Sequence, residues 1–190
     1  AWNQFKKNKV AMGGLVVVTL ATLSAIFAFF LTPYDPAQTN IMEAKEPPSA
    51  EHWLGTDKVG RDVLTRLLYS GRVSMMVGLI AMSISVTIGT IMGLIAGYFG
   101  GLVDTLIARL IDVVRSVPFI IMAITIASIW GPGLYRLMVI IGILSWTGVA
   151  RLVRGKVLSL REEEFLQAAR AAGGTDLRIM VKHLFPNSIA

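Results

Sequence analysis

The sequence predicts an all-α membrane protein: a polytopic bundle of transmembrane helices, with four spans in this chain, followed by a polar helix–turn–helix segment. Only 16% of the 190 residues are charged, whereas an ordinary soluble domain has about 25%. The charges are also unevenly spread, because none occurs in residues 11–31, 73–103 or 116–135. About 20 apolar residues cross a bilayer as a helix, so each of these stretches is expected to span the membrane.

A fourth span is expected over residues 137–150, a shorter neutral run between Arg136 and Arg151. Long basic side chains at such positions can extend to the membrane interfaces. The expected organisation is a cytoplasmic N-terminal segment, a first transmembrane helix, an external loop and a transmembrane core, over residues 1–10, 11–32, 33–72 and 73–190.

The first span could instead be a secretory signal peptide, since Lys6, Lys7 and Lys9 precede it. Its apolar run is longer than the roughly 7–15 residues of a signal-peptide core, and no A-x-A-like cleavage site follows it. We therefore favour an uncleaved membrane anchor.

The net charge of +6 would suit a nucleic-acid-binding protein, but the positions of the basic residues favour a membrane orientation signal. With the N-terminus in the cytoplasm, twelve of the 18 Lys and Arg residues fall in cytoplasmic segments and six fall outside. Cytoplasmic loops carry such an excess. The expected partner is therefore the lipid bilayer and no nucleic acid.

The external loop begins with the turn-forming sequence PYDP. From about Asp57 the pattern becomes helical, with apolar residues near one face at Val59, Val63, Leu67 and Leu68. We expect a short amphipathic helix that lies at the outer surface and covers the bundle.

The second span carries small residues at every fourth position: Ala81, Ser85, Gly89, Gly93 and Gly97. Helices in membranes associate by close backbone approach, which small side chains permit. The stripe is therefore expected to be a helix–helix contact. The alternative is that it lines a translocation path, where bulky side chains would block passage.

Arg109, Asp112 and Arg115 follow the second span at intervals of three, so they lie on neighbouring turns of a helix and can pair. They are expected at the cytoplasmic interface, because residues 116–135 are by themselves long enough to form the third span. The alternative is a proton or ion relay within the membrane. Pro118 can bend the helix at the start of the third span.

Residues 158–187, after the fourth span, have the pattern of two helices joined by a turn. Ser159 and Glu162 match a capping box, and Gly173 with Gly174 supplies a stop. The first helix has an apolar face formed by Phe165, Ala168, Ala169 and Ala172.

The second helix of this segment is expected to be capped by Thr175 or Asp176 and to end at Pro186. Its apolar face is formed by Leu177, Met180, Val181 and Leu184. Periodicity alone is equally compatible with a hairpin folded on the protein's own cytoplasmic surface and with a docking element for a partner.

The chain is expected not to be an enzyme and to bind no cofactor or metal itself. A phosphate-binding loop needs G-x-x-x-x-G-K-[ST], but the Gly-Lys pair at Gly155 is followed by Val157. The sequence has no H-E-x-x-H and no cysteine, and His52 and His183 fall on opposite sides of the membrane in the expected topology. No nucleophile–base constellation and no catalytic residue is identified.

The terminal segment resembles the EAA loop of ABC-importer permeases: Glu-Ala-Ala, a glycine four residues after the last alanine, and a closing proline. Gln167-Ala168-Ala169, Gly173 and Pro186 fall at these positions. More narrowly, nearly the whole chain is similar to the C-type permease subunit of dipeptide, oligopeptide and nickel importers, which are binding-protein-dependent transport systems. The matching stretches are PYDP, PPSAEHWLGTDKVGRDVLTRLLYSGRVS, AGYFGG, the GPG turn and ARLVRGKVLSLREEEFLQAARAAGGTDLRIMVKHLFPN.

Two departures accompany the resemblance. Gln167 stands where the general motif has glutamate, which places a carboxylate role at that position in doubt. Permeases of this group have about six spans, so a chain that ends four residues after Pro186 is expected to be part of a longer subunit.

The resemblance implies an ABC type I importer permease in a bacterial or archaeal inner or plasma membrane, with the N-terminus in the cytoplasm. It implies a translocation path for peptides, with a nickel complex as the alternative substrate. The implied partners are a homologous second permease subunit, two cytoplasmic ATP-binding subunits that use ATP and Mg, and an external or periplasmic solute-binding protein. Coupling to the ATPase subunits falls on Glu164, Phe165, Gln167, Ala168, Ala169, Ala172, Gly173, Asp176, Leu177 and Pro186.

Two hypotheses of other classes stay open at this point. One is a secondary transporter that uses Arg109, Asp112 and Arg115 as an ion relay. The other is a non-transporting membrane anchor or assembly factor, which the shortness of the chain suggests.

Overall fold

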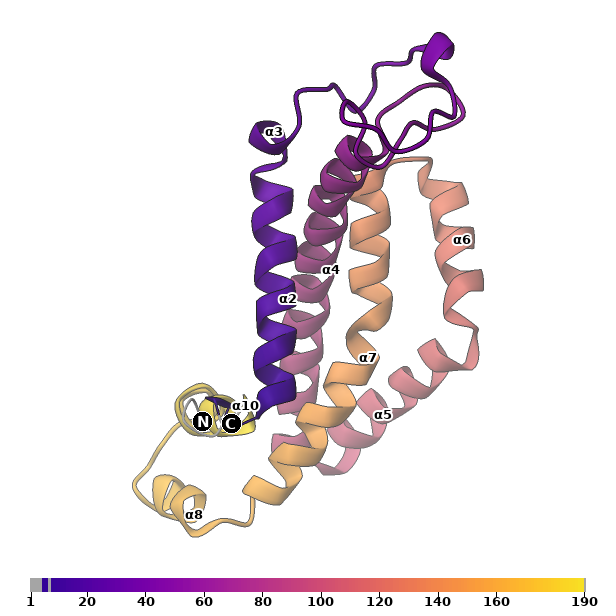
Figure 1. Ribbon diagram of the computed structural model, residues 1–190. Helices are drawn as coiled ribbons and strands as arrows, with labels where there is room; N and C mark the ends of the chain where they lie inside the picture. The colour runs from indigo at the N-terminus through magenta and orange to yellow at the C-terminus, as the bar shows by residue number, and fades with distance from the viewer. Residues whose placement is uncertain (1–4, 7, 190) are drawn as a thin grey trace. The chain divides into compact units, whose positions relative to one another are not determined.

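The computed structural model describes residues 5–6 and 8–189, and the elements named in this part of the chain are helices. The all-α prediction is thereby confirmed. The chain divides into two compact units, residues 1–77 and 78–190, with the boundary inside α4. The elements, labelled in part in Figure 1, are α2 (Lys9–Ile26), α3 (Ala28–Leu31), η1 (Ile41–Glu43), α4 (Val63–Phe99), α5 (Gly101–Ser116), α6 (Phe119–Trp130), α7 (Leu134–Leu160), α8 (Glu164–Ala171), α9 (Asp176–Ile179), η2 (Met180–Leu184) and α10 (Phe185–Ile189).

By length and composition, α2, α4 and α7 can each cross a membrane, and α5 with α6 makes a fourth span if the bent pair counts as one. The two helices of that pair are bent by 83°. The expectation that residues 116–135 cross the membrane alone is wrong, because α6 has only 12 residues. Pro118 prevents α5 from continuing into α6, since proline lacks the backbone N–H that a helix interior needs.

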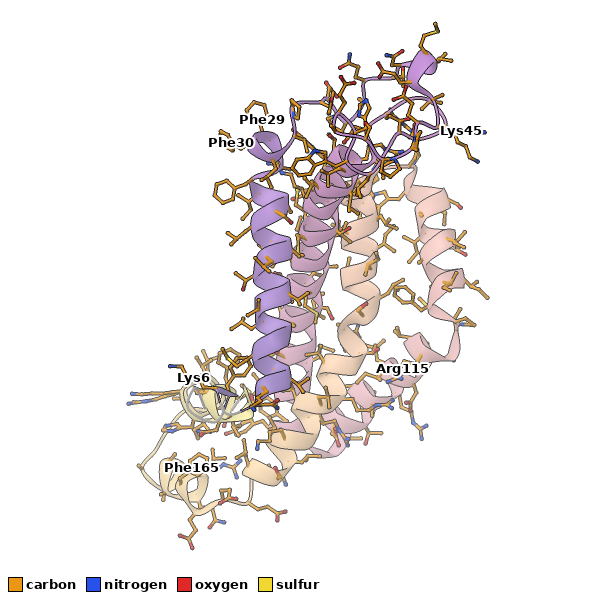
Figure 2. All side chains as sticks on the ribbon, viewed as in Figure 1. Lys6, Phe29, Phe30, Lys45, Arg115 and Phe165 are labelled. Atoms are coloured by element: carbon orange, nitrogen blue, oxygen red, sulfur yellow. The ribbon has the colours of Figure 1, made fainter. Side chains whose placement is uncertain are left out.

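In unit 1, the first turn of α2 is capped by Asn8: its side-chain oxygen accepts hydrogen bonds from the N–H groups of Val10 and Ala11, each at 3.1 Å. Its large apolar side chains are mostly exposed, as expected of a helix whose solvent is lipid. Small residues form its protein contact: Ala25 is buried, and a Cβ added at Gly71 of α4 would lie 3.4 Å from the Ala25 Cβ. Figure 2 shows Phe29 and Phe30 on α3, where both rings are exposed.

The loop between α3 and α4, residues 32–62, is held by its own polar side chains. The Asp57 carboxylate accepts the N–H groups of Val59 (2.9 Å) and Arg61 (3.1 Å), and the Arg61 Nε at 2.8 Å. These bonds close a tight turn around Gly60, whose φ is 74° and where a Cβ would meet the backbone of Asn40. The backbone hydrogen bonds from Val59 and Arg61, the Arg61 side chain and its positive charge hold the pKa of Asp57 below its usual range, although burial opposes them.

The prediction of a separate amphipathic helix from about Asp57 is wrong, because this turn occupies its expected start. Residues 57–62 are not helical, and the helix that follows is the start of α4. Asp62 begins it as an N-cap, because its Oδ1 accepts the Thr65 N–H at 2.6 Å. No proline interrupts α4 before Phe99, so one helix of 37 residues joins the predicted surface helix to the second span.

The same Asp62 also holds a buried histidine. His52 Nδ1 lies 3.0 Å from Asp62 Oδ2, its Nε2 lies 3.6 Å from Glu43 Oε2, and its ring stands 4.8 Å from that of Tyr34. The hydrogen bond to Asp62 raises the pKa of His52, and the charges of Asp62, Glu43 and Glu46 add to it, although burial opposes them. Burial raises the pKa of Asp62, but hydrogen bonds from Thr65 and His52 leave it lowered overall.

The His52–Asp62 pair predicts that the α3–α4 loop is most stable at mildly acidic pH. The stabilisation from Asp62 is complete above its ordinary pKa of 3.8 and is lost as the pH falls through its lowered value. The stabilisation from His52 is complete below 6.5 and is lost as the pH rises through its raised value. Amide hydrogen exchange of Gly55 and Thr65, corrected for intrinsic rates, should therefore show highest protection between about pH 4 and 6.5. His52→Gln should remove the alkaline loss, and equal protection of the wild type at pH 6 and pH 9 would contradict the prediction.

Unit 2 is organised by the contact between α4 and α7. A Cβ added to α4 would lie 2.6 Å from the nearest atom of α7 at Gly89, and 2.7 Å at Gly93 and at Gly97. Ala81 and Ser85 of the same stripe are buried. The stripe is thus a packing surface of α4 against α7, as close approach through small residues requires; a role in lining a translocation path stays a prediction.

Helix α5 joins this core through apolar and charged residues. Ile107 and Ile111 pack with Ala96, Trp146 and Ala150 in one buried cluster. Asp104 lies in the first turn of α5, and its carboxylate accepts hydrogen bonds from both Nε and Nη2 of Arg154 on α7, with Nη2···Oδ2 at 2.6 Å. This bidentate pair ties α5 to α7.

The ion pairs expected within the cluster Arg109, Asp112 and Arg115 are replaced by a contact between helices. Asp112 Oδ1 lies 3.5 Å from Nη2 of Arg151 on α7, and both side chains are more than half exposed. Figure 2 shows Arg115 at the end of α5, near the bend toward α6. An exposed pair of this kind does not have the buried, desolvated setting of an ion relay.

Candidate functional site

The candidate site is the terminal hairpin, defined as residues 164–189, which comprises α8, α9, η2 and α10. Each of its first three elements contributes one fully buried apolar residue, Leu166, Ile179 and Leu184 respectively. These three pack with Leu94 and Tyr98 of α4 and with Val157 of α7 in a single cluster. The inner face of the hairpin is therefore anchored on the ends of two long helices.

A polar junction reinforces this anchor. The Tyr98 hydroxyl donates to Asp176 Oδ1 at 2.6 Å, and the Arg170 guanidinium carbon lies 5.2 Å from the centroid of the Tyr98 ring. A cation over an aromatic face is attracted by the ring's negative potential. One side chain of α4 thus contacts both α8, through Arg170, and α9, through Asp176.

The turn between α8 and α9 depends on two glycines. Gly173 has a φ of 76°, a conformation that side chains with a Cβ rarely adopt. Its N–H donates to Arg170 O (2.9 Å) and the Gly174 N–H donates to Ala169 O (3.1 Å), the pair of bonds that ends a helix in a Schellman motif. A Cβ at Gly174 would lie 2.8 Å from Ala169 O, so both positions need glycine.

The outer face of the hairpin presents apolar side chains to solvent. Phe165, labelled on α8 in Figure 2, is 39% exposed, and Leu177 and Val181 are 69% and 58% exposed. A shallow cavity of about 250 Å³ lies beside the turn, lined by Ala169, Ala172, Gly173, Gly174, Arg178, Ile179 and His183. The remaining predicted coupling residues, Glu164, Gln167, Ala168, Asp176 and Pro186, are also exposed.

The predicted start of the hairpin is corrected by the structure. Helix α7 continues to Leu160, so Ser159 lies inside it and its hydroxyl donates to Lys156 O at 2.8 Å. The capping box of Ser159 and Glu162 therefore does not form. Helix α8 begins at Glu164 after Glu163, which makes no side-chain capping hydrogen bond.

The second half of the hairpin also differs from its predicted form. Of the predicted apolar face, Leu184 is buried and Met180 packs against the core, whereas Leu177 and Val181 are exposed and Ile179 is buried in addition. The π-helical turn η2 aligns residues five apart, which puts Ile179 and Leu184 on one face. Pro186 does not end the segment. It lies in the first turn of α10, where the missing N–H of proline is tolerated.

The second half of the chain identifies its family. Residues 89–190 match the family described as "Binding-protein-dependent transport system inner membrane component". The chain belongs to this family. The first 48 residues of this inner membrane transport component match a second family, the N-terminal TM domain of oligopeptide transport permease C.

Curated relatives of this transport component agree with the family. The chain is 47% identical over its whole length to the dipeptide transport system permease protein DppC of Alkalihalophilus pseudofirmus, and it covers 62% of that protein. It is 40% identical to DppC of Bacillus subtilis over all of this chain and 59% of the relative, and 37% identical to the oligopeptide transport system permease protein OppC of the same organism over 98% of this chain and 61% of the relative. The chain thus spans about three fifths of these proteins, and it belongs to a transport family rather than an enzyme family.

Within this inner membrane component, the residues that hold the hairpin were not predicted from the sequence. Tyr98 lies at the end of α4, whereas Leu166 and Arg170 lie on α8, 68 and 72 positions further along the chain. The one signal in the sequence was the position of Tyr98 near the end of a neutral span, since a buried tyrosine hydroxyl usually finds a hydrogen-bond partner. Gln167 was predicted, and its amide nitrogen donates to Glu162 O at 3.3 Å, a donation that an ionised glutamate could not make.

Proposed function

We propose that this chain is a membrane-spanning part of the permease subunit of an ATP-driven importer of peptides. It forms the translocation path with a homologous second permease subunit, and a solute-binding protein delivers the peptide from outside. Two cytoplasmic subunits bind and hydrolyse ATP with Mg. The chain itself binds no nucleotide and receives their motion through its terminal hairpin.

The choice of peptides rests on the relatives. Two of them are dipeptide permeases and one is an oligopeptide permease by name, and their identity to this chain extends over nearly all of it. The membrane setting rests on the inner membrane family and on the apolar helices α2, α4 and α7.

One observation supports the docking role of the hairpin most directly: its two faces differ. The inner face is anchored by Leu166, Ile179 and Leu184 on α4 and α7, while Phe165 and Leu177 remain exposed. Exposed apolar residues on an element that is already fixed to the protein provide a rigid surface for a partner. The Lys and Arg excess on the same side of the predicted topology supports a cytoplasmic position for this surface.

Ala168→Asp in the full-length protein tests this function. Ala168 is exposed on α8, so aspartate there leaves the hairpin's own core intact, whereas Ala169 packs against that core. A carboxylate buried without a partner in an interface costs several kcal/mol. Retention of the ATP-binding subunits by the purified permease should therefore fall by at least about ten-fold.

Ala37→Asp is the matched control, because Ala37 is an exposed alanine in the α3–α4 loop. It should retain the ATP-binding subunits at the wild-type level. Full retention by Ala168→Asp, in a variant that still inserts and purifies normally, would refute the docking surface and with it the coupling role of the hairpin.

A further inference from the structure

Tyr98 occupies a position where the hairpin meets the membrane-spanning helices. It is the second-last residue of α4 and is buried, with 7% of its surface exposed. Its hydroxyl reaches Asp176, the first residue of α9, and its ring lies beneath Arg170 in the last turn of α8. Both helices of the hairpin therefore converge on one side chain of α4.

The hydroxyl of Tyr98 serves the hairpin and not the core. A phenylalanine would fill the same space among Leu94, Val157 and Leu166, whereas the O–H group adds a hydrogen bond to a carboxylate. Hydrogen bonds with a charged partner are about twice as strong as neutral ones. Asp176 itself is exposed, so its contact with Tyr98 is not a by-product of apolar packing.

The end of α4 is joined to the other helices of unit 2. One residue before Tyr98, Gly97 packs against Val157 of α7, and a Cβ there would lie 2.7 Å from the Val157 Cβ. Two residues after it, Gly100 turns the chain into α5 with a φ of 66°. Asp104 of α5 in turn holds Arg154 of α7. A force on the last turn of α4 is therefore shared with α5 and α7.

We propose that Tyr98 is a positioning residue that transmits movement of the hairpin to α4. The hairpin follows α7 directly along the chain, through residues 161–163. The Tyr98–Asp176 hydrogen bond and the Arg170 contact add a polar connection to α4 beside the apolar packing on Leu94, so that α4 and α7 move with the hairpin together. This inference rests on the proposed coupling role of the hairpin and assigns that role a route into the membrane.

Tyr98→Phe in the full-length permease, assembled with its ATP-binding subunits, tests the inference. Because the chain has no cysteine, single cysteines at Met82 of α4 and Ile129 of α6, both exposed, can carry spin labels, provided that cysteines elsewhere in the complex are replaced. In the wild type, ATP should shift the population of label distances. In Tyr98→Phe this ATP-dependent shift should shrink about ten-fold, as expected for the loss of a hydrogen bond to a charged group, while the nucleotide-free distances stay as in the wild type.

Two further variants separate the possible results. Tyr135→Phe removes the hydroxyl of an exposed tyrosine and should leave the shift unchanged. Combining Tyr98→Phe with Asp176→Ala should be no worse than the more affected single variant, because both remove one interaction. An undiminished ATP-dependent shift in Tyr98→Phe, or no shift in the wild type, overturns the inference. Failure of the proposed function is recognised separately, as retention of the ATP-binding subunits by Ala168→Asp.

Discussion

Gly93→Leu is expected to destabilise the protein by about 3 kcal/mol or more, since it forces a large side chain into a packed contact. At Gly93 even a Cβ would lie 2.7 Å from both Ala150 O and Val153 Cβ of α7. Backbone atoms cannot move aside as the tip of a side chain can, so α4 and α7 must separate. Unfolding in mixed detergent micelles would measure the loss, followed by the fluorescence of Trp146, which is buried in the same core, in proteins whose other tryptophans are replaced by phenylalanine.

Gly78→Leu is the control for this substitution. Gly78 lies on the same helix, α4, and a Cβ added there has no atom within 4 Å. Leucine has a higher helix propensity than glycine, by up to about 1 kcal/mol, so the control should be neutral or slightly stabilising. If Gly93→Leu unfolded at the same denaturant concentration as Gly78→Leu, the close contact between α4 and α7 would be incorrect.

Asp104→Ala is expected to cost about 2 kcal/mol, because it leaves Arg154 without its carboxylate in a position that is two thirds buried. Asp112→Ala is the comparison: its pair with Arg151 is longer and more exposed, and such pairs contribute about 0–1 kcal/mol. Thermal unfolding of the solubilised protein should show a clear shift for the first variant and little for the second.

Exchanging the two charges tests whether the Asp104 effect arises from pairing. Asp104→Arg combined with Arg154→Asp should recover part of the stability that either single variant loses, since the ion pair between α5 and α7 can form again. Additive losses in the double variant would show that Asp104 and Arg154 stabilise the fold separately.

The membrane-spanning helices were predictable from the sequence because a bilayer imposes a length and a composition. Residues 11–31 lie in α2 and α3, and residues 137–150 lie mostly in the first half of α7. The stripe from Ala81 to Gly97 predicted a close contact with another helix, since small residues at every fourth position allow two helix backbones to approach each other. Helix ends were less predictable: Ser159 satisfies a capping pattern, yet α7 passes through it.

The third span shows where local patterns fail. The neutral run 116–135 satisfied the length rule, but the rule ignores how Pro118 and Gly131 divide the run. The predicted ion pairs within the charged cluster were wrong for a related reason. The spacing places Arg109 and Asp112 on neighbouring turns of one helix, but in the fold Asp112 pairs with Arg151 on α7. Spacing within one helix does not identify which residue of a neighbouring helix a charged side chain will meet.

The sequence by itself determined that the chain is helical, that it has apolar segments long enough to cross a membrane, and that Gly173 ends a helix in a polar segment after them. These features depend on the chemistry of neighbouring residues, which can be read locally. Only the tertiary structure decided that α4 meets α7 through Gly89, Gly93 and Gly97, and that Tyr98 holds Asp176 across 78 positions. Such contacts depend on the relative placement of whole helices, which no single segment of the sequence specifies.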